Sequence, residues 1–150
     1  MLDVKTLSCL MLSFGSMSNK KLQKICYYIY SWYLTLYNHK IAPLKFEAWV
    51  HGPVSRELYN QYKEYGWEDI PQYKGFLLAD SNTIEFAKLI WDVYGHYTAD
   101  ELEAMTHLEQ PWLNARKGYK KFDSSDVQLN DNNIISFFGD KYRNSGHITA

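Results

Sequence analysis

Residues 19–38, NKKLQKICYYIYSWYLTLYN, decide the fold of this 150-residue chain. Their apolar side chains recur every three or four residues, which places them along one side of an α-helix. This apolar stripe comprises Leu22, Ile25, Cys26, Ile29, Tyr33, Leu36 and Tyr37. Ser18 can cap the first turn, and a rise of 1.5 Å per residue makes the helix about 30 Å long. We therefore predict that this helix is the spine of the domain.

The opposite face of the same helix changes from charged to aromatic along its length. It carries Lys20, Lys21, Lys24, Tyr28, Trp32 and Thr35. A solvated helix face does not normally hold a Tyr and a Trp four residues apart. Either another element covers these two rings, or they form a surface for a partner.

The segments around this helix also show regular periods. Residues 3–14 have helical spacing and stop at Gly15-Ser16, so they predict a first amphipathic helix. Residues 46–50 alternate with a period of two, which predicts a short strand. The sequence His51-Gly52-Pro53 then favours a turn, and helical spacing over residues 54–65 predicts the next helix.

The middle of the chain predicts a loop, a strand and a helix. Residues 66–75 have the composition of a loop, and the apolar run 76–79 is expected to pair with 46–50 in a two-stranded ribbon. The sequence Asp80-Ser81-Asn82 offers a cap for a helix that reaches residue 94. Apolar residues lie on almost every side of that helix, so we expect it at the centre of the core.

The last third of the chain predicts three further helical segments. Thr98 and Glu101 have the spacing of a capping box, so a helix begins at residue 98, and Pro111 allows a turn into a short helix that ends at Ala115. A last short helix around residues 134–138 is capped by the polar run 130–133, and residues 144–150 are expected to be mobile. The predicted fold is mainly α: a compact single-domain helical bundle around a central apolar helix, with a short two-stranded β ribbon.

The composition favours a binding protein. With 46% apolar and 22% charged residues, the chain has the makeup of one globular domain, and its 13 Tyr, 7 Phe and 5 Trp exceed what a small core needs. A net charge of −1 argues against a protein that coats nucleic-acid duplexes. Cys9 and Cys26 lie in apolar helical patterns without a second ligand at metal-binding spacing, so we expect buried, reduced thiols.

The amino end resembles a short signal-peptide core over residues 7–14. Asp3 offsets Lys5, however, and no small-residue cleavage site follows, so we interpret the segment as a mature helix. No run approaches the ~20 apolar residues of a membrane span. We expect a cytoplasmic protein without membrane contact.

Two patterns raise the alternatives of catalysis and nucleic-acid binding. A metal-dependent hydrolase would use His51, His96, His107 and Glu109, but residues two apart on a helix point about 200° away from each other, so His107 and Glu109 cannot chelate one ion from one helix. A basic cluster of Arg116, Lys117, Lys120 and Lys121 surrounds Tyr119 and could contact single-stranded nucleic acid. Cations also stabilise a helix C-terminus, and the chain shows no matching basic stripe, so neither alternative is favoured.

Three blocks of sequence, in this order, resemble one family. They are Lys21–Tyr28 with Trp32 and Leu36, Phe46–Val54 with Leu58-Tyr59, and Tyr94–Arg116 with its Tyr97-Thr98-Ala99, Thr106-His107 and Pro111-Trp112 positions. Together they resemble the Panacea domain of the SocA-like antitoxin family, which includes phage-associated proteins. The resemblance covers about residues 4 to 140. Met105 stands where Leu is usual, and Cys26 where the family often has Leu.

The resemblance implies an antitoxin domain over residues 1–143 that neutralises a co-encoded toxin by direct protein–protein contact in a bacterial or prophage system. In some members the domain instead delivers the toxin to a protease, as an adaptor. No catalytic activity, cofactor or metal is implied, and DNA-binding autoregulation is not expected because the chain has no room for the helix-turn-helix domain of some relatives. The sequence does not specify an oligomeric state. We predict that the toxin contacts the aromatic side of the central helix and the segment after the turn at 51–53, through Tyr28, Trp32, His51, Arg56 and Tyr59.

Overall fold

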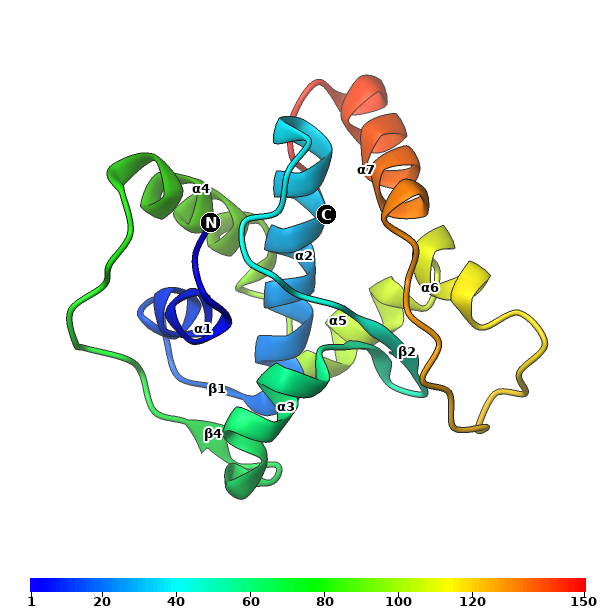
Figure 1. The fold of residues 1–150 in the computed structure, drawn as a ribbon, viewed down its shortest axis with the longest axis horizontal. Helices are drawn as coiled ribbons and strands as arrows, with labels where there is room; N and C mark the ends of the chain where they lie inside the picture. The colour runs from blue at the N-terminus through cyan, green and yellow to red at the C-terminus, as the bar shows by residue number, and fades with distance from the viewer.

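The computed structural model describes all 150 residues and contains seven α-helices, one 3-10 helix and two small antiparallel sheets (Figure 1). The helices are α1 (Val4–Leu12), α2 (Asn19–Tyr37), α3 (Arg56–Tyr62), η1 (Lys63–Tyr65), α4 (Ser81–Tyr94), α5 (Ala99–Thr106), α6 (Gln110–Ala115) and α7 (Asp131–Ser145). The strands are β1 (Met17–Ser18), β2 (Glu47–Trp49), β3 (Gly52–Val54) and β4 (Asp69–Ile70). No helix has both the length and the apolar composition that crossing a bilayer requires.

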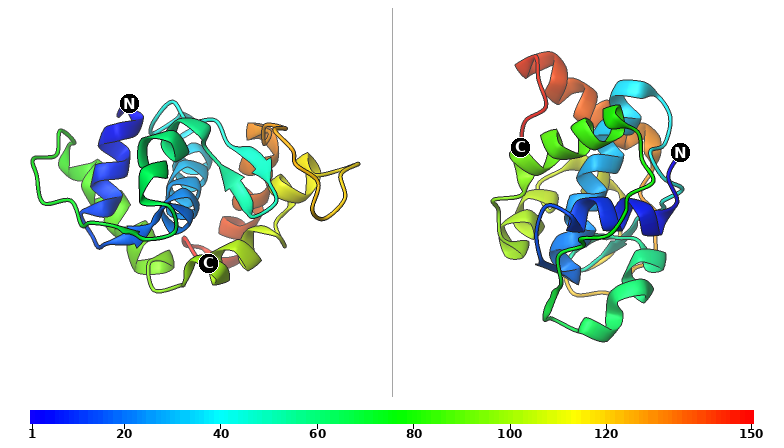
Figure 2. Two further views of the ribbon diagram at one scale, coloured as in Figure 1. Left: turned by 90° about the horizontal axis from the view of Figure 1, so that it is seen from below. Right: turned by 90° about the vertical axis from the view of Figure 1, so that its left-hand side faces the viewer.

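Helix α2 is the spine that the sequence predicts, and it also lies at the centre of the molecule. Figure 2 shows it enclosed by the other helices, and it packs against α1, α3, α4, α5 and α7. The Ser18 hydroxyl accepts a hydrogen bond from the Lys21 backbone N–H, which caps the first turn, and Asn38 ends the helix in a left-handed conformation with φ 57°. Asn tolerates this conformation better than most residues, so the helix stops where the sequence predicts. The fold class is therefore confirmed: a mainly helical bundle around a central helix.

Strand β2 pairs with β3 in a hairpin. The prediction that residues 46–50 pair with residues 76–79 is therefore wrong. Glu47, Ala48 and Trp49 lie opposite Val54, Pro53 and Gly52, respectively. A turn at residues 50–51 brings the two strands together with little loss of chain entropy, whereas pairing with 76–79 would close a much longer loop. The free edge of β2 is also occupied, because the Ala48 N–H donates to the Val127 carbonyl and Glu47 bridges to Gln128. Val54 thus stays in a strand, and α3 begins two residues later under a Ser55 cap.

Helix α4 lies at the periphery, which corrects the expectation that it occupies the centre of the core. Only Phe86, Ala87, Ile90 and Tyr94 of this helix are buried. Ile84 and Leu89 face solvent, and Lys88 forms an exposed ion pair with Asp92. The longer helix α2 already fills the centre, so α4 contributes one side only, despite apolar residues on its other sides.

The chain end returns to the core beside α4. The Ile148 side chain is buried, and the Tyr94 hydroxyl donates a hydrogen bond to the Thr149 carbonyl at 3.1 Å. The domain boundary at residue 143 and the mobility of residues 144–150 stay predictions.

Candidate partner-binding surface

An aromatic and charged cluster covers the outer face of the β2–β3 hairpin. Glu47 holds the Arg56 guanidinium through Nη2–Oε1 and Nε–Oε2 distances of 2.8 and 3.3 Å, and it also accepts a 3.0 Å hydrogen bond from Trp49 Nε1. The guanidinium lies 5.3 Å from the centre of the Trp49 ring, and the Tyr59 ring lies 5.3 Å from the same ring. Burial opposes ionisation of Glu47, but the hydrogen bonds from Arg56 and Trp49 outweigh it and keep the pKa of Glu47 below its usual value. We call Trp49, Arg56 and Tyr59 the hairpin cluster.

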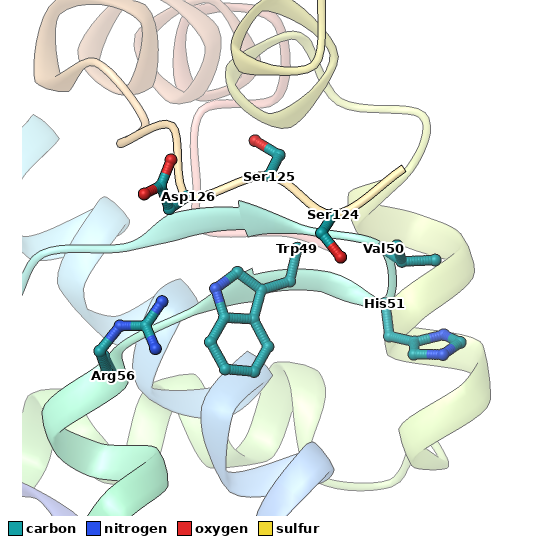
Figure 3. Close-up of a pocket in the computed structure, with 7 residues that line it drawn as sticks. All are labelled: Trp49, Val50, His51, Arg56, Ser124, Ser125 and Asp126. Atoms are coloured by element: carbon teal, nitrogen blue, oxygen red, sulfur yellow. The ribbon is translucent and has the colours of Figure 1, made fainter. Parts of the chain in front are cut away.

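A hollow of about 560 Å³ opens beside this cluster (Figure 3). Residues of the hairpin and α3 line one side, and Ser124, Ser125 and Asp126 line the other. In Figure 3 the Arg56 and Trp49 side chains lie next to each other on the same side of the hairpin, and His51 lies at its tip. The hairpin therefore presents a cation, an aromatic ring and hydrogen-bonding groups to one open space, which is the composition of protein-binding surfaces.

The inner side of the hairpin is fixed to α2. Gln23 forms two hydrogen bonds with the Ser55 backbone, from Nε2 to the carbonyl at 3.1 Å and from the Ser55 N–H to Oε1 at 2.9 Å. Gly52 has φ +110°, and a Cβ at this position would lie 2.5 Å from Lys24 Cε and 2.9 Å from Thr106 Oγ1. Only glycine combines this backbone conformation with so close an approach to α2 and α5. The position of the hairpin is therefore set by packing rather than left to a flexible loop.

Lys24 lies fully buried beneath the hairpin, where its Nζ donates one 3.3 Å hydrogen bond to the Pro53 carbonyl. Burial lowers the pKa of Lys24 to about 7, and the positive charge of Lys20 lowers it further, while Glu103 acts in the opposite direction. No carboxylate lies within ion-pair distance of Lys24. A buried ammonium without a counter-ion is energetically unfavourable, so this residue is unusual for a structural lysine.

A charged network joins the hairpin tip to α5. The Oε1 atom of Glu103 lies 2.6 Å from Lys20 Nζ and 3.0 Å from His51 Nδ1, and Lys20 also reaches Asp100 at 2.7 Å. Burial favours the neutral form of Glu103, but the hydrogen bonds from Lys20 and His51 keep its pKa below the usual value. His51 therefore has a carboxylate partner while most of its side chain stays exposed.

Helix α6 supports the hairpin from behind. The His107 and Trp112 rings stack at 4.1 Å, and Trp112 Nε1 donates to the Trp49 carbonyl at 2.9 Å. The buried Arg116 guanidinium donates hydrogen bonds to the carbonyls of Ala48, Lys120, Lys121 and Asp123. Arg116 thus attaches the following loop to β2 and does not contribute to the predicted basic cluster.

The structure brings three of the five predicted contact residues together and buries the other two. His51, Arg56 and Tyr59 are exposed around the hairpin. Tyr28 and Trp32 have no exposed surface, because α7 and Tyr94 cover them, so they are removed from the contact surface. Tyr28 stacks on Tyr94 at 4.0 Å and donates to Glu109, and Trp32 Nε1 donates to the Tyr94 hydroxyl.

No group of three or more His, Cys, Asp or Glu side chains is arranged to hold a metal ion. Of the residues considered for hydrolysis, His107 stacks on Trp112, Glu109 is buried against Tyr28, and His51 binds Glu103. They belong to three separate contacts rather than to one site.

Sequence reasoning did not select Glu47, Trp49 and Lys24 as candidate site residues. The signal for Trp49 was present, since the alternation over residues 46–50 places Trp49 and Glu47 on the side away from the core. The contact of Lys24 with Gly52 depends on a turn 28 residues later, and helix periodicity alone assigns Lys24 to a solvated face.

Comparison with known proteins assigns the chain to a family. A family model described as antitoxin SocA-like, Panacea domain, matches residues 22–113, from the first turn of α2 into α6. The matched segment includes most of α2, the hairpin, the hairpin cluster and the His107–Trp112 stack. Neither the curated proteins nor the solved structures include a match to the chain.

Proposed function

Because this chain belongs to the SocA-like antitoxin family by its Panacea domain, we propose that it is an antitoxin that neutralises a co-encoded toxin by direct binding. In this proposal the antitoxin acts in the cytoplasm as a binding protein, not as an enzyme, and the toxin contacts the hairpin cluster and His51. The observation that supports this surface most strongly is the Arg56–Trp49–Tyr59 arrangement, in which Arg56 and Tyr59 are exposed, Trp49 is half-buried, and Glu47 holds Arg56 in place. Preorganised aromatic and Arg side chains are typical of residues that dominate binding energy.

Coexpression with the product of the neighbouring gene tests the proposal. We expect the neighbour to be toxic alone, to become harmless when the chain is coexpressed, and to copurify with it as one complex. A neighbour that is harmless alone and does not copurify would overturn the antitoxin function.

Paired variants locate the surface. Arg56→Glu removes an exposed, ion-paired Arg from the hairpin cluster, and Arg143→Glu removes a comparable one, paired with Asp140, from α7. Tyr59→Ala and Tyr142→Ala form a second pair with nearly equal exposure, 39% and 38%. We expect the Arg56 and Tyr59 variants to weaken toxin binding at least tenfold and their controls less than twofold. Equal effects within each pair would show that the toxin binds elsewhere.

A proteolytic adaptor is the second candidate, because an adaptor needs a second surface that stays free while the toxin is bound. A separate hollow of about 610 Å³ is lined by apolar residues that include Leu2, Tyr33, Phe76 and Leu78. In Figure 1 the segment before α4 lies on the far side of α1 and α2 from the hairpin. Measuring the toxin's half-life in cells with and without the antitoxin separates the candidates: a shortened half-life supports the adaptor, and an unchanged one supports occlusion alone.

A further inference from the structure

A second groove of about 560 Å³ lies on the other side of Trp49, between the start of α2, α3 and the hairpin. Its lining contains three lysines, Lys20, Lys24 and Lys63, together with His51, and no Asp or Glu. The overall charge of the chain is −1, so this concentration of cations is a local property. Trp49, Tyr59 and Trp67 provide aromatic surface in the same groove, and Trp67 is 87% exposed.

The floor of this groove holds polar groups that lack sufficient partners. Lys24 is only 1% exposed, and its ammonium, which can donate three hydrogen bonds, makes one at 3.3 Å. Asn19 is 5% exposed and also lines the groove, and its Oδ1 atom has no hydrogen-bond partner although its Nδ2 donates to the Tyr59 carbonyl. Buried polar groups are normally paired, so an under-used donor and an unpaired acceptor in the lining of one groove support a ligand that completes the site.

The charges around the floor favour an anion. Lys20 already has counter-ions in Asp100 and Glu103, but Lys24 and Lys63 have no ion pair. The first turn of α2 contains no acidic residue, so the positive end of its helix dipole is not offset there either. A carboxylate that entered the groove would therefore meet two lysine side chains that have no ion pair and the N-terminus of the longest helix.

We propose that this groove binds an acidic segment of a partner protein, with a carboxylate directed at Lys24 and Lys63 and an adjacent apolar side chain against Trp67. The assignment of that partner as the toxin rests on the proposed antitoxin function. The negative net charge of the chain favours a polypeptide over a nucleic acid. The free Oδ1 of Asn19 can accept a hydrogen bond from a backbone N–H of such a segment.

The test uses a short probe peptide that does not depend on identifying the partner. Acetyl-Glu-Glu-Trp-Glu-Glu-amide is titrated into the ¹⁵N-labelled full chain, with acetyl-Gln-Gln-Trp-Gln-Gln-amide as the uncharged control. We expect the acidic peptide to shift the signals of Asn19, Lys24 and the Trp49 and Trp67 indoles, and the Gln peptide to bind at least tenfold more weakly. Shifts elsewhere on the chain, or equal binding of the two peptides, would overturn the proposal.

Variants and a nucleic-acid probe complete the test. Lys24→Met removes the buried charge while keeping a similar volume, and Lys63→Glu reverses the exposed charge without altering the core. Each should weaken the acidic peptide at least tenfold, whereas Lys117→Glu, an exposed lysine remote from the groove, should change it less than twofold. If Lys24→Met does not fold, Lys63→Glu decides. Competition by a ten-nucleotide single strand for the same signals would assign the groove to nucleic acid and refute the proposal.

The outcomes for the groove and for the antitoxin function are separable. A toxin that binds the wild type and both groove variants equally would leave the antitoxin function intact and remove the groove from the toxin interface. A neighbouring gene product that never copurifies would overturn the antitoxin function, while the peptide titration would still decide whether the groove takes an acidic ligand.

Discussion

Replacing Gly52 with alanine should destabilise the domain more than any other single methyl addition at a glycine with positive φ. The backbone at φ +110° costs an alanine on the order of 1–3 kcal/mol. The new Cβ would also lie 2.5 Å from Lys24 Cε and 2.9 Å from Thr106 Oγ1, and overpacking of a filled interior typically costs about 1–3 kcal/mol more. We therefore expect Gly52→Ala to lower the free energy of unfolding by about 4 kcal/mol, or the Tm by about 10 °C.

Gly118→Ala is the matched control, because Gly118 also has a positive φ, +86°, but a Cβ there would meet nothing within 4 Å. The destabilisation of the Gly118→Ala variant therefore measures only the free-energy cost of a positive φ in a residue with a Cβ. Urea unfolding followed by circular dichroism should show a lower midpoint for both variants at an unchanged m-value, with Gly52→Ala lower by the packing cost. In a double-mutant cycle, the effects of Gly52→Ala and Lys24→Ala should be non-additive by about 1–2 kcal/mol, since Lys24→Ala removes the atom nearest to the new Cβ. Equal destabilisation by Gly52→Ala and Gly118→Ala would refute the close contact between the hairpin and α2.

Three further predictions concern the interior and one helix start. Burial raises the pKa of Glu109 to about 7 against a usual value of 4.5, so its contribution to the free energy of unfolding is fully present below pH 4.5. This contribution, on the order of 3 kcal/mol, is lost as the pH rises to about 7. Glu109→Gln should lack the loss in urea unfolding at pH 5 and pH 8, and equal pH dependence in both proteins would contradict the assignment. Arg116→Lys should lower the free energy of unfolding by about 2 kcal/mol, because a lysine ammonium cannot reach the four carbonyls that Arg116 binds. Thermal unfolding measures this change, and a value below about 0.5 kcal/mol would show that these hydrogen bonds contribute little. Thr98→Ala removes the capping box with Glu101 and should cost about 1 kcal/mol, which the same thermal unfolding measures; an unchanged Tm would argue against the cap.

Local signals in the sequence were sufficient for most of the helices. The capping box at Thr98 and the Ser18 cap both form as predicted, because each depends only on residues within one turn. The long apolar stripe of α2 predicted the spine of the domain for the same reason. The error at α4 has a different origin: its apolar residues occupy several faces, and the depth of burial depends on which neighbours are present rather than on the composition of the helix itself.

The candidate surface was only partly predictable. His51, Arg56 and Tyr59 follow directly from their places around the turn at residues 50–51, so sequence reasoning selected them correctly as neighbours. Tyr28 and Trp32 were expected on the same surface because α7, which covers Trp32 through Phe138, is more than 90 residues away in the chain. The cationic groove was missed for a similar reason, since it combines the first turns of α2 with Lys63 and Trp67 from a later part of the chain.

The long-range contacts of α2 also set the order in which the protein can mature during synthesis. Trp32 is covered by Phe138, Tyr30 bonds to Asp131 at 2.7 Å, and Tyr94 reaches Thr149. The central helix is made early, but its aromatic face stays open until the last 20 residues have left the ribosome, at a rate of about 5–20 residues per second. For several seconds each new chain therefore exposes apolar side chains that the finished domain buries, and this interval recurs with every molecule that is synthesised.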